Sequence, residues 1–114
     1  MEYLLILDFE ATCEEQTRIS PQEVIEFPSV LLNIRTNTVV DEFQSYVRPI
    51  HHPVLSKFCT ELTGITQDKV EQAPTFPTVF ANYLNWLQSH NLNEQNCLIV
   101  TCGGIYTIVT FLNY

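Results

Sequence analysis

A short apolar run that ends in two acidic residues constrains this chain more than any other feature. The run Tyr3–Leu7 has the length and composition of a buried strand, and Asp8, Phe9 and Glu10 follow it directly. Because strand side chains alternate between faces, we expect both carboxylates on one face and Phe9 in a core on the other. Two adjacent carboxylates repel each other unless a cation lies between them. Such oxygen ligands suit Mg²⁺, so the pattern predicts a metal-dependent phosphoryl-transfer site.

The alternative for an Asp-x-Glu pair is a pair of solvated surface acids, which is how most such pairs occur in proteins. The position of Asp8 and Glu10 directly after an apolar strand favours a site. The rest of the chain has to decide between these two interpretations.

Composition limits the classes of function that remain. The chain has 114 residues, of which 46% are hydrophobic and 16% are charged, as is typical of one globular domain. Its net charge of −8 argues against a broad electrostatic surface for RNA or DNA. A small metal-bridged site stays compatible with this charge, because carboxylates gathered around cations add to the acidic count.

The cysteines and the N-terminal sequence predict a compartment. The four cysteines form no Cys-x-x-Cys pair and have apolar neighbours, which favours buried free thiols over disulfides or zinc ligands. The run Tyr3–Leu7 is too short for a signal peptide, and no stretch is long enough to span a membrane. We therefore expect an intracellular protein of the cytoplasm or nucleus that is not secreted.

Periodicity and turn residues predict strands, then helices, then a further strand. Pro28 favours an edge position or a bulge for the strand that contains it. The order predicts an α/β domain with a ribonuclease H-like layout, in which three antiparallel strands are followed by helices and a parallel strand. The expected strands are Tyr3–Leu7, Glu23–Ile34, Val39–Val47 and Cys97–Thr101, and the expected helices are Val54–Thr60, Gln67–Glu71 and Pro77–Ser89.

Several motifs, in the same order along the chain, resemble one nuclease family. Asp8–Cys13 looks like the first exonuclease motif of the DEDDh superfamily. Together the motifs are similar to those of the Snipper-like 3′-5′ exoribonucleases, the group that includes the enhanced-RNA-interference exonuclease. The further motifs are Glu23–Pro28, Phe43–Pro49, Phe58–Ile65 and Val100–Gly103.

The resemblance implies hydrolysis of phosphodiester bonds from RNA 3′ ends, with DNA as an open second substrate. It also implies two Mg²⁺ or Mn²⁺ ions that bind the scissile phosphate. By the family match, Asp8 bridges the two ions and Glu10 helps to hold one of them. Glu26 is either a partner near this site or a surface residue. His51 and His52 are not the family's catalytic base, which lies later in the sequence of its members.

The resemblance also implies where the last nucleotide binds. Ala11 and Thr12 would lie beside the 3′-terminal nucleotide, and the segment Leu62–Ile65 would line the pocket for its base. The residues implied there are Leu62, Thr63 and Ile65, with apolar contacts that tolerate any base. The alternative is that Leu62 and Ile65 only close the core.

The end of the sequence departs from the family pattern. The family's second motif continues into Asp-Trp-Asp, whereas Tyr106 stands here at the place of the last Asp, and the third motif is absent. We interpret residues 1–103 as the N-terminal part of an exonuclease domain that is incomplete at its C-terminus. Residues 104–114 read as a divergent tail, and we hypothesise that it is non-native sequence. Gly103 and Gly104 can turn this tail back as a hairpin strand.

These departures lower the activity expected of this chain. With two of four acidic ligands, Mg²⁺ would be held loosely, so we expect weak activity or none. An apolar face of the sheet should also be open to water. The alternative function is a non-catalytic binding module, a regulatory isoform of the same fold, and its net charge favours a protein partner over RNA. The sequence does not identify that protein partner.

Overall fold

The computed structural model describes residues 1–102 and 104–107. The chain forms two compact units. The first unit comprises Met1–Asp8, Pro28–Gln44 and the chain from Asn82 onward, and the second comprises Phe9–Phe27 and Ser45–Ala81.

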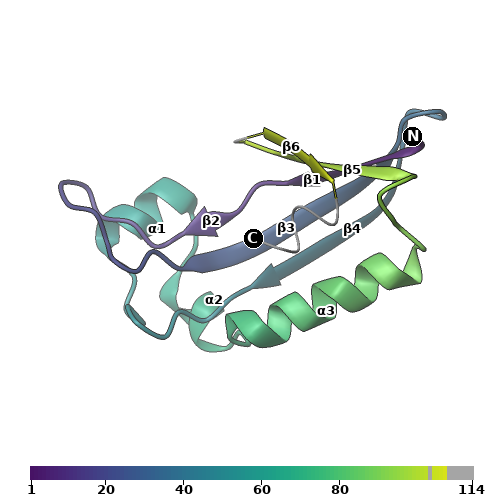
Figure 1. The fold of residues 1–114 in the computed structure, drawn as a ribbon. Coiled ribbons are helices and arrows are strands. Elements are labelled where there is room, and N and C mark those ends of the chain that lie inside the picture. Colours follow the sequence, from purple (N-terminus) through teal and green to yellow (C-terminus); the bar gives the residue numbers. More distant parts are fainter. Residues whose placement is uncertain (103, 108–114) are drawn as a thin grey trace. The chain divides into compact units, whose positions relative to one another are not determined.

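The element order confirms the predicted α/β class (Figure 1). Among the described residues, hydrogen-bonded strands follow the order β2-β3-β1-β5-β6, and β4 also pairs with β3. Strand β1 is antiparallel to β3 and parallel to β5, as the ribonuclease H-like layout requires. The strands are β1 (Tyr3–Leu7), β2 (Glu10–Ala11), β3 (Val24–Asn33), β4 (Thr38–Tyr46), β5 (Cys97–Thr101) and β6 (Gly104–Thr107), and the helices are α1 (Lys57–Thr63), α2 (Gln67–Glu71) and α3 (Phe76–Ser89).

In the first unit, one face of the sheet carries the core. Alternate residues of the three paired strands are at most 2% exposed, and the second half of α3 contributes Tyr83 and Leu87 to the same core. The Tyr83 hydroxyl lies 2.9 Å from the Ser29 hydroxyl, so two buried polar groups satisfy each other. The buried strand residues are Leu5, Leu7, Ser29, Leu31, Cys97 and Ile99.

The opposite face of this sheet is aliphatic and only partly covered. The strand registers align six side chains on it, and Ile6 at the centre is 39% exposed. The exposure of Ile6 confirms the expectation of an apolar face open to water, although its neighbours are half-buried. The six residues are Leu4, Ile6, Val30, Leu32, Leu98 and Val100.

A polar cluster ties β4 to α3 within the first unit. Asp41 accepts a hydrogen bond of 2.8 Å from Trp86 Nε1, and His90 Nε2 lies 2.8 Å from the same carboxylate oxygen. Hydrogen bonding from His90 and then from Trp86 lowers the pKa of Asp41. Beside this cluster, the rings of Phe43 and Tyr83 meet edge to face at 5.1 Å.

In the second unit, α1 and α2 pack on the first part of β3. A core of Ile25, Cys59, Ile65 and Val70 joins the three elements. The predicted helix Val54–Thr60 is wrong by three residues at each end.

Capping explains that shift. The Ser56 hydroxyl accepts a 3.0 Å hydrogen bond from the Cys59 N–H, so the helix begins at Lys57. Gly64, at φ 76°, ends it with a left-handed residue whose N–H donates to the Thr60 carbonyl. Residues 61–63, which the prediction leaves outside the helix, therefore form the last turn of α1.

Strand β3 is not an edge strand, so the edge position expected from Pro28 is wrong, whereas the register of β3 with β2 shifts by one residue between Val24 and Glu26, in line with the expected bulge. Its pairing with β1 ends at Ser29 and its pairing with β2 begins at Glu26, while β4 pairs with it as well. Pro28 lies in the interval between the first two pairings. Its missing N–H therefore removes a hydrogen bond from neither of these two ladders.

Strand β6 confirms the predicted hairpin as far as Thr107. It pairs antiparallel with β5, with Gly104 opposite Thr101, and the later tail residues lie outside the described part of the chain. All four cysteines are free, as predicted, but Cys102 is exposed, so the expectation of burial is wrong there. No helix of the described chain has the length and apolar character that a membrane span needs.

The Ser29–Tyr83 pair gives a test of this core. Tyr83→Phe and Ser29→Ala should each lower the free energy of unfolding by about 1–2 kcal/mol, because each removes the buried hydrogen bond between the two hydroxyls. The double variant should lose clearly less than the sum, since it removes both partners. Urea unfolding measures all three variants, and strictly additive losses would contradict the buried pair.

Candidate functional site

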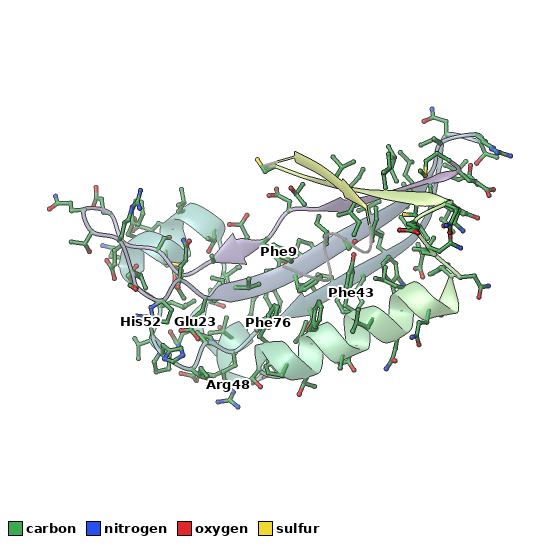
Figure 2. The ribbon with its side chains drawn as sticks, in the orientation of Figure 1. Phe9, Glu23, Phe43, Arg48, His52 and Phe76 are labelled. Atoms are coloured by element: carbon green, nitrogen blue, oxygen red, sulfur yellow. The ribbon has the colours of Figure 1, made fainter. Side chains whose placement is uncertain are left out.

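Asp8 directly follows β1. Because side chains alternate along the strand, Asp8 lies on the same exposed side of the first unit as Ile6. No strand is formed at Asp8 and Phe9, so β1 and β2 are separate strands. In the second unit, the ring of Phe9, labelled in Figure 2, meets the ring of Phe27 edge to face at a centroid distance of 4.6 Å, and Phe27 is fully buried. The expectation that Phe9 points into a core is confirmed.

Glu10 faces another acid across the β2–β3 ladder. It lies in register with Glu26, so the two side chains leave the same face of the second unit, and both are half-buried. Like charges placed opposite each other destabilise a ladder. Two carboxylates on one face can also attract a cation to that face. The structure thus places Glu26 beside Glu10. The sequence alone leaves open whether Glu26 is a partner near the site or a surface residue.

Helix α1 is fixed to the segment that follows Glu10. The Cys59 thiol donates to the Ala11 carbonyl at 3.7 Å, and the Ser56 hydroxyl donates to the Cys13 carbonyl at 2.9 Å. Both contacts join residues more than 40 positions apart in the sequence. The second unit therefore brings residues 11–13 of the first motif together with the Phe58–Ile65 motif.

Thr12 is held by its surroundings and is only 2% exposed. Its hydroxyl accepts a hydrogen bond of 3.0 Å from the Glu23 N–H, and its own N–H donates to the Glu23 carbonyl at 2.8 Å. Gln22 Nε2 donates to the Thr12 carbonyl at 3.0 Å. These bonds fix the backbone beside Ala11, and a contact of Thr12 with a nucleotide stays a prediction.

The three residues predicted to line a base pocket differ in their surroundings. Leu62 is 67% exposed, whereas Ile65 is 3% exposed and belongs to the core of the second unit. The Thr63 hydroxyl donates to the Cys59 carbonyl at 2.8 Å and accepts from the Ile65 N–H at 3.1 Å. The alternative of core closure therefore describes Ile65, and Leu62 is the apolar side chain available to a ligand.

Glu23 organises a loop, a role that the sequence does not reveal. Its carboxylate accepts hydrogen bonds from the N–H groups of Ile50, His51 and His52 at 2.7, 3.0 and 2.9 Å. Partial burial opposes ionisation of Glu23, but these three bonds prevail and lower its pKa. The sequence separation of 27–29 residues hides the contact. The only signal is a proline-flanked loop in need of partners for its backbone N–H groups.

The described residues fit only part of a two-ion centre. Among them, no three His, Cys, Asp or Glu side chains gather where they could hold a metal ion. Mg²⁺ can bind through one or two carboxylates when it keeps several waters. Carboxylates of the first motif are thus suitable donors for a hydrated ion, and no described group of donors fits a pair of ions.

Comparison with known proteins shows which family this chain belongs to. The family model described as Exonuclease (RNase_T) matches residues 5–114. The chain belongs to this exonuclease family. It is 53% identical over 97 residues to ERI1 exoribonuclease 2 of Danio rerio and 44% identical over 115 residues to 3′-5′ exoribonuclease 1 of Homo sapiens.

Solved exonuclease structures share the fold. The nuclease domain of 3′hExo, a DEDDh family member bound to rAMP, superposes with a TM-score of 0.85 at 44% identity over 98% of this chain. Cell-death related nuclease 4 gives a TM-score of 0.83 at 33% identity over 88% of this chain. The chain spans 56% of the 3′hExo chain, 32% of the human relative and 17% of the Danio rerio relative.

Glu23 should make stability depend on pH. Because its folded pKa is lowered, its stabilisation is fully present above the ordinary glutamate pKa and is lost as pH falls through the folded value. At pH 7, Glu23→Gln should lower the free energy of unfolding by about 1–2 kcal/mol. Urea unfolding at several pH values should show this difference shrinking below about pH 4. Glu14→Gln, in an exposed loop, is the matched control, and an equal loss there would contradict the assignment.

Leu62 and Ile65 should respond differently to truncation. Ile65→Ala should lower the free energy of unfolding by about 2–4 kcal/mol, because it opens a cavity in the core. Leu62→Ala should change it by less than about 0.5 kcal/mol, because that side chain is exposed. Thermal or urea unfolding of the two variants decides, and comparable losses would show that Leu62 also closes the core.

Proposed function

We propose that this chain is part of a 3′-5′ exoribonuclease, which hydrolyses phosphodiester bonds from RNA 3′ ends. The observation that carries the proposal is the exonuclease family match over residues 5–114, which includes Asp8 and Glu10 at the end of an apolar strand. Named relatives are 3′-5′ exoribonucleases, and one similar structure is described as 3′-end-specific recognition of a histone mRNA stem-loop. The names of these relatives support RNA as the substrate, and an assay with DNA tests whether the enzyme also hydrolyses DNA.

We propose Asp8 and Glu10 as metal ligands and catalytic residues of the complete protein, with Mg²⁺ or Mn²⁺ as the ion. Such an ion, when bound, supplies Lewis-acid polarisation of the scissile phosphate and a more acidic attacking water. The pairing of Glu10 with Glu26 supports this, because facing carboxylates favour a cation on their face.

The nucleotide site is proposed on the same unit. Ala11, Thr12 and the segment Leu62–Ile65 would surround the 3′-terminal nucleotide, and exposed Leu62 would contact its base. The hydrogen bonds of α1 to the Ala11 and Cys13 carbonyls support this arrangement, since they hold both segments together. Thr63 and Ile65 would act by shaping this segment.

For this chain taken alone, we propose negligible hydrolysis. Two carboxylates hold Mg²⁺ loosely, and groups that act as a unit lose most of their rate when one is removed. The division into a domain part, residues 1–103, and a divergent tail, residues 104–114, belongs to this proposal. We also propose an intracellular, reducing compartment, which the four free cysteines support.

The alternative function is a non-catalytic binding module for a protein partner. The net charge of −8 and the partly open aliphatic face around Ile6 favour it. RNA binding measured across salt concentrations separates the two. RNA affinity at any salt concentration supports the exoribonuclease assignment, and its complete absence supports the protein-binding module.

Asp8 gives the direct test of catalysis. In a protein that joins this chain to the remainder of an exonuclease domain, Asp8→Asn should lower the rate of RNA shortening by more than about 100-fold in Mg²⁺, because it removes a metal ligand. Glu14→Gln should leave the rate within about twofold, because that acid lies in an exposed loop. The assay follows 5′-labelled RNA on a sequencing gel.

The same assay on the chain alone should show no stepwise shortening in Mg²⁺ or Mn²⁺. Robust shortening that Asp8→Asn abolishes would contradict the proposed loss of activity and would support the metal site. Shortening that survives Asp8→Asn in the longer protein would overturn the proposed role of Asp8.

A further inference from the structure

The second unit contains a pocket that the proposed active site does not use. It has a volume of about 390 Å³, within the range of about 300–1,000 Å³ typical of small-ligand sites. We call it the Arg48 pocket. Its walls come from the start of β3, the loop after β4 and the start of α3, and they include Val24, Val47, Arg48, Ile50, His51 and Phe76.

Hydrogen bonds between distant segments hold these walls in place. The Val47 N–H donates to the Ile25 carbonyl at 2.9 Å, and the Arg48 N–H donates to the Pro74 carbonyl at 2.8 Å. The Glu23 carboxylate holds the loop from the other side through the N–H groups of residues 50–52. In Figure 2, Glu23, Arg48 and Phe76 come from three segments and lie in one region of the second unit. The pocket is therefore preformed.

The lining combines an aromatic ring with a cation. Phe76 is 41% exposed, although the centroid of the stacked Phe80 ring lies 5.7 Å from the centroid of its own ring and that of Phe27 lies at 6.3 Å. Arg48 is exposed and forms no ion pair in the part of the chain that the structure describes. Ile50 adds an apolar rim that is 62% exposed. Aromatic faces bind bases and guanidinium groups bind phosphates, so this pairing suits a nucleotide.

Charge is more favourable here than in the chain as a whole. The residues that line the pocket include one acidic residue, Glu23, and one arginine, Arg48, so their formal charges balance. The acid in the wall, Glu23, already accepts three N–H donors, which offset its charge. An anionic ligand thus meets less repulsion at this pocket than the net charge of −8 suggests.

Glu23 also connects the pocket to the proposed nucleotide site. Its N–H donates to the Thr12 hydroxyl, and its carboxylate binds the loop of Ile50 and His51. We propose that the Arg48 pocket binds one nucleotide of a single RNA strand, with the base against Phe76 and the phosphate at Arg48. This inference rests on the proposed RNA substrate and adds a second contact point for the strand, away from its 3′-terminal nucleotide.

Binding of a single-stranded pentaadenylate to the isotope-labelled chain tests the proposal, with EDTA present so that no metal-dependent hydrolysis occurs. Amide signals of Ile50, His51 and Phe76 should shift on titration. Arg48→Met and Phe76→Leu should each weaken binding about tenfold, since one removes a charged contact and the other an aromatic face. Arg35→Met, in an exposed turn, removes the same charge and should change affinity by less than about twofold.

Several results would overturn the proposal. These are the absence of shifts at the pocket, equal loss in Arg48→Met and Arg35→Met, or binding of AMP without binding of the pentanucleotide. Binding of the acidic peptide acetyl-Asp-Glu-Phe-amide in place of RNA would assign the pocket to a protein. The amide spectrum of each variant confirms folding, and exposed Arg48 gives a variant that does not disturb the core.

The test separates this inference from the proposed function. Binding is measured in EDTA through the amide signals of the pocket residues, so failure of RNA hydrolysis in the longer protein leaves the pocket result standing. Conversely, Asp8-dependent hydrolysis combined with unchanged RNA binding in Arg48→Met would overturn only the pocket.

Discussion

The alternation of buried and partly exposed residues along β3 is the constraint on which the structure depends. Every second residue from Ile25 to Leu31 is buried, so alternate side chains of this strand belong to the core of the second unit up to Phe27 and to the core of the first unit from Ser29. Phe9 packs on Phe27 on the buried side of β3, and Glu10 stands opposite Glu26 on the other. A slip of one residue in the pairing would exchange these faces, bury the acids and expose the aromatic rings. The hydrophobic effect in the core thus determines where the carboxylates lie.

Features set by local sequence could be predicted well. Apolar runs predicted β1 and β5, the residues around Pro77 predicted α3, and the glycine pair predicted the start of β6. The predictions failed where a distant contact or a helix cap determines the bounds or the pairing of an element. Because of the N-cap at Ser56 and the left-handed Gly64, α1 begins and ends three residues later than predicted. Pro28 is tolerated inside β3 because it lies between the pairing of β3 with β1 and its pairing with β2.

The candidate site was predictable in kind but not in detail. The first motif identifies Asp8 and Glu10 as chemically distinctive, but only strand register reveals that Glu26 faces Glu10. The different surroundings of Leu62 and Ile65 likewise follow from tertiary packing. The bonds of Glu23 join three stretches of chain, so no local pattern could identify them. Residues that carry chemistry were visible in the sequence, whereas residues that position them were not.

The central claim is that the acids of the first motif bind divalent cations. It is tested most directly by titrating Mn²⁺ into the isotope-labelled chain and mapping the paramagnetic loss of amide signals. The account predicts that the first signals lost are those of Asp8, Glu10 and Glu26, and that Mg²⁺ restores them by competition. Signal loss centred on the exposed loop acids Glu14 and Glu15, with Asp8 and Glu10 unaffected, would contradict it.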